Sequence, residues 1–238
     1  MILAAHQLHY LPWLRYFHKI ASADTFVVLD DIQFNKNGWQ NRNKIKTQQG
    51  EFLLTIPVLH SFQQLLSEVA IDKKISWQKK HWGTISNAYR KASCFKDHDV
   101  FFRQIYEKEW AKLNELNNEM LTYFVKFLGI RTKIVRSSEL AVKGEASERL
   151  VNLCKELGAD TYLTGSFAAG AYLDQAMFEK QKIEVKRHAF ECPVYPQLYP
   201  EAGFIPELSI VDLLFNCGTK SLEVLMNSAP FNTKSASF

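Results

Sequence analysis

The chain has 238 residues, a formal net charge of +4 and 47% hydrophobic residues. This length suits a single domain with a substantial core, and the composition is ordinary for a soluble globular protein. No apolar run reaches the roughly 18–20 residues of a membrane span, and the N-terminus lacks the basic region of a signal peptide. We therefore expect a cytoplasmic protein without a membrane partner. The mildly positive charge suits an anionic ligand without requiring nucleic acid.

Strands and helices alternate in the predicted order of elements. An apolar strand over 2–5, a helix over 13–21 and a strand over 25–29 form a compact βαβ unit. The other predicted elements are, in chain order, strands over 51–58 and 68–71, a helix over 77–91, a long helical region over 100–128, a strand over 133–135, a helix over 146–157, a strand over 161–164, a helix over 168–180, a strand over 183–185 and a short helix over 207–215. No element is predicted in 33–46, which is polar and basic, or in the proline-rich segment 192–206.

This alternation predicts an α/β fold, with a mainly parallel Rossmann-like sheet flanked by helices. We expect one domain over 1–228, in which 77–128 forms a helical insertion or subdomain. The last residues, 229–238, are small and polar and are expected to be a disordered tail.

The loop after the first strand is unusually rich in polar and aromatic side chains. Ligands of parallel sheets bind beyond the carboxyl ends of the strands, where this loop lies. Its candidate residues suit an anionic phosphate beside a helix N-terminus, and they are His6, Gln7, His9, Tyr10 and Trp13. The two histidines also have the His-x-x-His spacing of nucleotidylyl transferases, although that family's glycine is missing. The alternative is a loop packed through aromatic anchors.

Two further segments carry groups that suit a nucleotide or a sugar. Asp30 and Asp31 end the second strand and can bind ribose hydroxyls or magnesium, or else simply start a turn. The basic segment that follows offers an arginine for phosphate, amides for a sugar and an indole for stacking. Its candidates are Gln33, Trp39, Gln40, Asn41, Arg42, Asn43 and Lys46.

Two later segments suit an anion more weakly. The predicted helix over 77–91 contains Lys80, His81 and Tyr89 and is read as a solvated face, a nucleotide-phosphate site or a nucleic-acid site. The turn at Gly165 and Ser166 has the glycine spacing of a P-loop but lacks its lysine, which leaves a backbone anion nest as the functional reading.

Several common chemistries are disfavoured. There is no Gly-x-Gly-x-x-Gly, His-Glu-x-x-His or Gly-x-Ser-x-Gly motif, so hydride transfer, zinc proteolysis and esterase chemistry lose weight. The four cysteines form no Cys-x-x-Cys pair and are expected to be free thiols. We predict no metal site among them.

Taken together, the polar motifs resemble the WbqC-like family of bacterial proteins. The resemblance covers about residues 2 to 218 and rests on these residues: His6-Gln7, Tyr10 to Trp13, Tyr16-Phe17, Leu29 to Asp31, Gln33-Phe34, Trp39 to Asn43, Ile45-Lys46, Lys80-His81, Tyr89, Ala159 to Leu163, Gly165, Tyr172-Leu173, Tyr195 to Gln197, Leu208 to Ile210 and Asp212 to Phe215. Departures from the family pattern are Leu8 in place of proline, His9 in place of asparagine and Arg15 in place of glycine.

The resemblance implies a role in the biosynthesis of O-antigen or another surface polysaccharide. It implies transfer of an amino acid, such as glycine, to a nucleotide-linked amino sugar. In that reaction His6, or second His81, would be the base, and Asp30 or Asp31 would orient it or bind magnesium. Arg42 and Lys46 would hold phosphates. Ser209 and Asp212 would either cap the last predicted helix or complete the site.

The donor and the oligomeric state stay open at this point. Activation by adenylation would require ATP and Mg²⁺, whereas an amino acid carried by tRNA would require neither and would give Lys80 a role. Two alternatives to the transferase remain. One is a non-catalytic protein that binds a sugar nucleotide or a partner in polysaccharide assembly, and the other is a nucleotidylyl-transferase-like enzyme. General nucleic-acid binding is disfavoured by the small net charge.

Overall fold

A computed structural model describes residues 1–165 and 173–227. Its central sheet has five parallel strands in the order β7-β2-β1-β8-β9. Counted along the chain as strands one to five, this order is 3-2-1-4-5, which is that of a doubly wound nucleotide-binding sheet. The predicted parallel α/β fold is confirmed.

The elements of the sheet and its cover are β1 (Ile2–Gln7), α1 (Leu14–Ala21), β2 (Thr25–Leu29), β7 (Lys133–Arg136), α5 (Ala146–Leu157), β8 (Thr161–Thr164), α7 (Gln175–Lys180) and β9 (Glu184–Arg187). The long connection from β2 to β7 contains β3 (Arg42–Thr47), β4 (Gly50–Thr55), β5 (Val58–Leu59), β6 (Ala70–Ile71), α2 (Trp77–Tyr89), α3 (Phe95–Glu107) and α4 (Leu113–Leu128). The chain ends in α8 (Ile210–Cys217) and α9 (Ser221–Met226).

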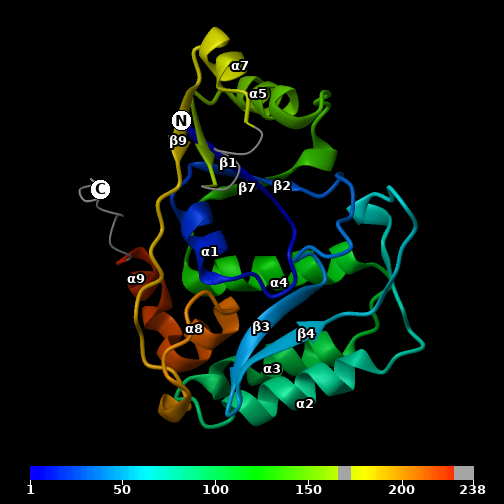
Figure 1. Cartoon of the computed structure of the whole chain (residues 1–238), viewed down its shortest axis with the longest axis vertical. Helices are drawn as coiled ribbons and strands as arrows, with labels where there is room; N and C mark the ends of the chain where they lie inside the picture. Colours follow the sequence, from blue (N-terminus) through cyan, green and yellow to red (C-terminus); the bar gives the residue numbers. More distant parts are fainter. Residues whose placement is uncertain (166–172, 228–238) are drawn as a thin grey trace, which may run out of the picture.

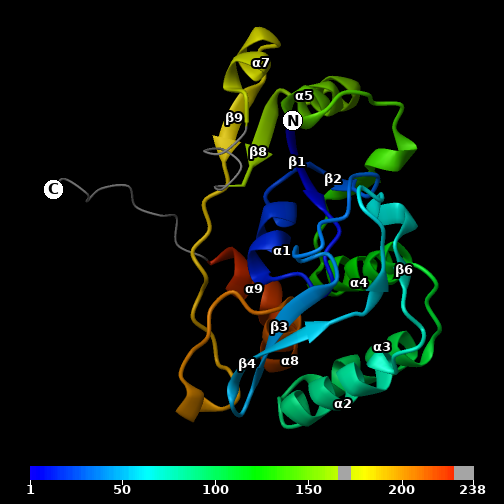
Figure 2. The ribbon, with the colours of Figure 1, turned by 45° about the vertical axis from the view of Figure 1, so that its right-hand side comes forward.

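Helices cover both faces of the sheet (Figure 1). Alternate residues of β1 point to opposite faces, so Leu3 and Ala5 join a core with α5 and α7, whereas Ala4 joins a larger core with α1, α4 and α8. That larger core continues into α2 and α3. The segment after β9 runs from the sheet along α1 to the lower half of the molecule, as Figures 1 and 2 both show.

The predicted long helical region over 100–128 is two helices, α3 and α4. The break falls where the chain pairs with the neighbourhood of β6: the Ile71 amide donates to the Ala111 carbonyl, and the Leu113 amide donates to the Val69 carbonyl. Because these backbone groups bond across to another segment, they cannot continue a helix.

The structure corrects five other predictions. β3 occupies the end of segment 33–46, where no element was expected. The strand expected over 51–58 divides into β4 and β5, and Pro57 lies between them. The helix expected over 168–180 starts at Gln175 after its cap Asp174, and residues 168–172 lie outside the described residues. The helix expected over 207–215 starts at Ile210, and α9 was not expected at all.

None of the helices in the described ranges is long and apolar enough to cross a membrane. The expected tail, 229–238, lies outside the described residues.

Candidate functional site

The sheet divides at the carboxyl end of β1. The ladder of β1 with β8 ends at Ala4 and Leu163, whereas the ladder with β2 continues to Gln7 and Leu29. The helical connections also reverse between β1 and β8, which makes this the topological switch point of the sheet. Ligands of doubly wound sheets bind in the crevice at that point.

His6 lies at this division and is partly exposed. Its ring contacts His9 edge to face at 4.7 Å between centroids and Tyr16 at 5.1 Å. Burial, with a smaller contribution from the charge of Lys19, lowers the pKa of His6 to about 3. The ring is therefore neutral at pH 7. Its Nδ1 lies 3.2 Å from the Gln7 carbonyl oxygen, which can only accept, so Nδ1 carries the proton and Nε2 has a free lone pair.

Lys19 lies on the buried face of α1, near enough to His6 for its charge to affect that ring. The residue is only 5% exposed, and its Nζ donates to the Ala5 carbonyl oxygen at 2.9 Å. Burial lowers its pKa to about 8. Within the described residues, no carboxylate pairs with this ammonium group.

Side chains from α1 and from the segment after β9 lie near Lys19 and His6 and complete this corner of the sheet. His188 follows β9, its amide donates to the Thr164 carbonyl at the end of β8, and its Nε2 lies 2.7 Å from Nδ1 of His18. Burial, followed by the charges of His18, Lys19 and Arg15, lowers the pKa of His188 to about 3. Arg15 forms an ion pair with Glu207 at 2.8 Å.

Two distant motifs meet beside this crevice, the loop after β1 and the segment that leads into β3. The Gln40 amide donates to Gln7 Oε1 at 2.8 Å, and Asn43 Nδ2 donates to the carbonyl oxygen of Leu11 at 2.7 Å. Gln40, Asn41 and Asn43 are almost completely buried. Gln40 and Asn43 thus hold the two segments together, whereas Asn41 donates to the Ile56 carbonyl.

Trp13 and Trp39 form the exposed part of the same junction. Their rings meet edge to face at 5.4 Å, and both line an open cavity of about 350 Å³. Two ion pairs, Arg15 with Glu207 and Lys44 with Glu51, lie on its walls. His9 packs on Trp13 and is 4% exposed, and its Nδ1 has no hydrogen-bond partner among the residues that the structure describes. Arg42 is partly exposed and donates to the Lys36 carbonyl.

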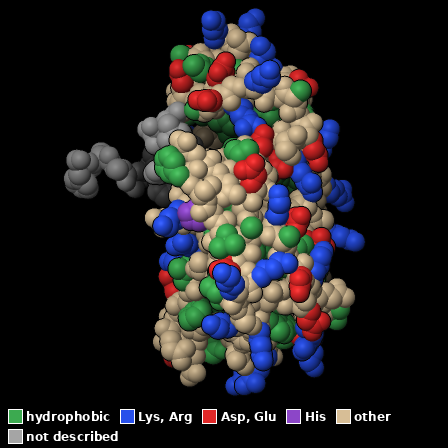
Figure 3. Space-filling view, turned by 90° about the vertical axis from the view of Figure 1, so that its right-hand side faces the viewer, with side chains coloured by type: hydrophobic (Ala, Val, Ile, Leu, Met, Phe, Trp, Pro, Cys, Tyr) green, Lys and Arg blue, Asp and Glu red, His purple; other side chains and the backbone are tan. Residues whose placement is uncertain are grey.

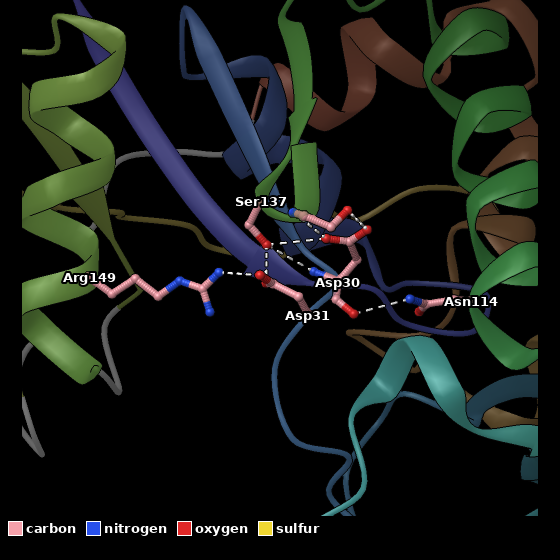
Figure 4. Close-up of polar contacts among 6 residues, drawn as sticks. Asp30, Asp31, Asn114, Ser137 and Arg149 are labelled. Atoms are coloured by element: carbon pink, nitrogen blue, oxygen red, sulfur yellow. Dashed lines mark hydrogen bonds and ion pairs between the residues drawn. The ribbon is translucent and has the colours of Figure 1, made fainter. Parts of the chain in front are cut away.

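Asp30 and Asp31 lie at the end of β2 in a hydrogen-bonded network with the segment after β7 (Figure 4). Ser138 Oγ donates to Asp30 Oδ2 at 2.7 Å, and Ser137 donates to both carboxylates. Arg149 of α5 forms an ion pair with Asp31. Burial raises the pKa of Asp31, but the bonds from Ser137 and Arg149 outweigh it, so the net pKa lies below its usual value.

Asp30 also lines a cavity of about 370 Å³ with Leu8 and α4 residues. In the described residues, neither aspartate is hydrogen-bonded to His6. No group of three His, Cys, Asp or Glu there is arranged to hold a metal ion.

His81 lies apart from this crevice. It is 6% exposed, its Nδ1 is 2.9 Å from the Tyr10 hydroxyl, and that hydroxyl shares a further hydrogen bond with Tyr106. Burial lowers the pKa of His81 to about 4. This buried chain joins α2 and α3 to the loop after β1.

A second buried network surrounds Asp212 of α8. Its two carboxylate oxygens accept from the hydroxyls of Tyr89 and Tyr195, each at 2.8 Å. Lys46 donates from its amide to the Tyr89 hydroxyl and from Nζ to the Gly203 carbonyl at 2.6 Å. Burial raises the pKa of Asp212 despite these bonds. Ser209 caps α8 by accepting from the Val211 amide.

The remaining candidates are scattered. Gln33 and Lys80 are exposed, and Gly165 follows β8. Ser166 lies outside the described residues.

Sequence reasoning missed Lys19 and His188. Lys19 falls on the apolar face of the predicted helix, between Tyr16 and Ile20, which is the signal for a buried lysine. His188 follows the predicted strand over 183–185 and lies at the same edge of the sheet as His6.

The fold and the gathered side chains define a doubly wound α/β protein with polar side chains gathered at its switch point. Residues 7–224 match the WbqC-like protein family, and the chain belongs to that family. It is also 36% identical over 223 residues to the uncharacterized protein Rv1507c of Mycobacterium tuberculosis (strain ATCC 25618 / H37Rv). The aligned region covers 92% of this chain and 95% of that protein.

Proposed function

We propose that this protein is a transferase that acylates an amino-sugar nucleotide with an amino acid, as part of surface-polysaccharide (O-antigen) biosynthesis. The observation that carries the proposal is the position of His6. It lies at the switch point of the sheet, partly exposed and neutral, with its Nε2 lone pair free. A neutral imidazole at a ligand crevice is a suitable acceptor for the proton of an attacking amine.

In the proposed step, the amine nitrogen of the sugar attacks the activated carbonyl carbon of the amino acid. The new C–N bond forms, the bond to the donor's leaving group breaks, and Nε2 of His6 takes the amine proton. A pKa near 3 makes this imidazole a weak base in the free protein. An anionic substrate beside it would raise that pKa and so strengthen the base.

In this proposal one part of the ligand binds at the switch point and another part binds in the cavity lined by Trp13 and Trp39, the tryptophan cavity. Trp13 and Trp39 offer aromatic surface for a base or a sugar ring. Arg42 remains a candidate for phosphate, whereas the ammonium of Lys46 is already bound to Gly203 and Gln197. Lys and Arg are interspersed with Asp and Glu on the face drawn in Figure 3, which favours a small ligand over general nucleic-acid binding. Whether ATP and Mg²⁺ activate the amino acid, or a tRNA carries it, is part of the test.

The first experiment measures thermal stabilisation by nucleotide sugars with and without an amino group, by ATP with magnesium, and by glycine. A ligand at a hundredfold excess over Kd stabilises the native state by about 2.7 kcal/mol. Stabilisation by amino-sugar nucleotides, but not by their hydroxyl counterparts, supports the proposal. Additional stabilisation by ATP supports adenylation.

The second experiment assays transfer with His6→Gln. We expect turnover to fall by roughly 10²–10⁴, with the affinity for the sugar nucleotide within a few-fold of the parent. The matched control is His60→Gln, because His60 is exposed in a loop. Unchanged turnover in His6→Gln would refute the role of His6 as the base. Binding without any turnover would favour the non-catalytic sugar-nucleotide protein instead.

The contact between His6 and His9 favours a second candidate, a nucleotidylyl-transferase-like enzyme. That enzyme would release pyrophosphate from a nucleoside triphosphate in the presence of a sugar phosphate. A pyrophosphate-release assay without amino acid separates it from the acyl transferase.

A further inference from the structure

Lys19 carries a buried charge that nothing in the described part of the chain neutralises. Only 5% of the residue is exposed, and one of the three Nζ protons is accounted for, by the Ala5 carbonyl. An ammonium group in this position is unfavourable because burial removes its hydration without a carboxylate to compensate. A buried cation at the ligand-binding edge of a doubly wound sheet is therefore a candidate for function.

The groups around Lys19 are those that an anion requires. β1 contributes His6, the segment after β9 contributes His188, and α1 contributes His18 and Arg15. Arg15 of this set is paired with the carboxylate of Glu207. His9 lies in ring contact with His6 and lacks a partner at Nδ1. The corner thus combines a cation with imidazoles, and within residues 1–165 and 173–227 no carboxylate pairs with Lys19.

We propose that Lys19 and His188, beside His6, form the binding site for a phosphoryl group at the split between β1 and β8. A phosphoryl group has several terminal oxygens, so it can accept from the Lys19 ammonium and from the His188 imidazole at once. The inference rests on the proposed function for the rest of the ligand, the nucleotide and the sugar. It replaces Lys46 as the main phosphate-binding lysine, since the ammonium of Lys46 is used within the fold.

A phosphoryl group in this site changes the protonation of its neighbours. Its negative charge raises the pKa of each group that faces it, namely Lys19, His6 and His188, with His18 and Arg15 behind them. Lys19 in the free protein has a pKa of about 8. Binding therefore weakens as the pH rises from 7.5 to 9.5, because the free protein then loses the proton that the complex requires.

The experiment titrates the full chain with inorganic pyrophosphate by calorimetry and compares the parent with Lys19→Met. We expect at least a tenfold loss of affinity at pH 7.5 and loss of most of the pH dependence. The ionisation of pyrophosphate itself is common to both proteins, so the difference isolates Lys19. The matched control is Lys79→Met, because Lys79 is an exposed lysine on α2, away from the sheet. We expect it to bind as the parent does.

The melting temperature without ligand supplies an independent readout. Methionine has a similar length and no charge, so Lys19→Met should melt higher than the parent if the lysine is kept for binding. A purely structural lysine would instead lose its bond to Ala5 and melt lower. If Lys19→Met does not fold, Lys19→Gln, which retains an N–H donor, takes its place in the titration.

Three results would overturn the site: no binding of pyrophosphate by the parent, binding by Lys19→Met within twofold of the parent, or equally tight binding of malonate. The last would show a general anion site. Failure of the proposed function is distinguishable. If pyrophosphate binding depends on Lys19 but no acyl transfer is detected, only the proposed transferase function is refuted. If Lys19→Met catalyses transfer with an unchanged KM for the sugar nucleotide, only the phosphoryl site is refuted.

Discussion

Two buried polar clusters of this protein differ in how many of their hydrogen-bonding groups have a partner. Around Asp212, both carboxylate oxygens accept from tyrosine hydroxyls, and the neighbouring Lys46 ammonium donates to a carbonyl and an amide oxygen. At the switch point, counting described residues, Lys19 has one acceptor and His9 has an unpartnered nitrogen. A satisfied network stabilises a fold, whereas unsatisfied charge is unfavourable until a ligand arrives. Residues of both clusters were candidates from the sequence, and we infer that the second, in which described groups leave Lys19 and His9 partly unpartnered, is available to a ligand.

We expect the difference between the two clusters to appear most strongly as a loss of stability in acid. His6 and His188 bind protons near pH 6.5 when unfolded but only near pH 3 when folded. Between these values the unfolded state holds more protons, so stability falls as the pH falls, by up to about 1.4 kcal/mol per pH unit for each imidazole. Urea unfolding at pH 7, 6 and 5 measures this. His188→Gln should remove the contribution of one imidazole from the pH dependence of the unfolding free energy. An unchanged slope of that free energy against pH would contradict the low pKa of His188 in the folded protein.

Removing the centre of the satisfied cluster should produce the largest loss by mutation. Asp212→Ala leaves the hydroxyls of Tyr89 and Tyr195 without their acceptor in a buried site. We expect the free energy of unfolding to fall by about 3 kcal/mol, because each stranded group loses its solvation as well as its bond. Urea unfolding measures it, with the exposed Glu156→Ala as the control. A loss below about 1 kcal/mol would show that the network is not structural.

The chain of Tyr10, Tyr106 and His81 should give a smaller effect. Tyr106→Phe removes one hydroxyl partner of Tyr10, which retains His81. We expect a loss of about 1 kcal/mol and a melting temperature lower by about 2–4 °C. His81→Gln should lower stability without lowering transfer per folded molecule. A specific loss of turnover in that variant would restore His81 as a catalytic candidate.

The smallest effect is expected at the rim of the tryptophan cavity. Glu51→Gln removes the ion pair with Lys44 across β3 and β4, in which both side chains are more than a third exposed. Such pairs contribute 0–1 kcal/mol, so we expect a change within about 0.5 kcal/mol that vanishes at high salt. A larger loss in urea unfolding would mean that the hairpin register depends on this pair.

Local patterns predicted the elements whose signals lie within a few residues. The spacing of Tyr16, Phe17 and Ile20 predicted α1, and the run from Thr25 to Leu29 predicted β2 with its bounds. β3 was missed because Ile45 is the only apolar residue among its six, and the strand exists through pairing with β4. α3 and α4 were merged because the break depends on bonds from Val69 and Ile71, about 40 residues away in the chain.

The candidate site was predicted in part for the same reason. The rule that ligands bind at carboxyl ends of strands placed His6, Asp30 and Gly165 along one edge of the sheet. It could not distinguish Lys46, which donates within the fold, from Lys19, which has no carboxylate partner in the part of the chain that the structure describes. Residue type and spacing are the same before and after burial, so they do not reveal which charge is compensated.

The sequence by itself determined the alternation of strands and helices, the parallel sheet and membership of the WbqC-like family, because these depend on periodicity and local motifs. Only the tertiary structure decided the order of the strands, the meeting of His18 with His188, and the burial of Lys19 near His6. These features depend on contacts between segments up to 170 residues apart. Burial and compensation of charge are properties of such contacts, and they set which side chains remain available to bind a ligand.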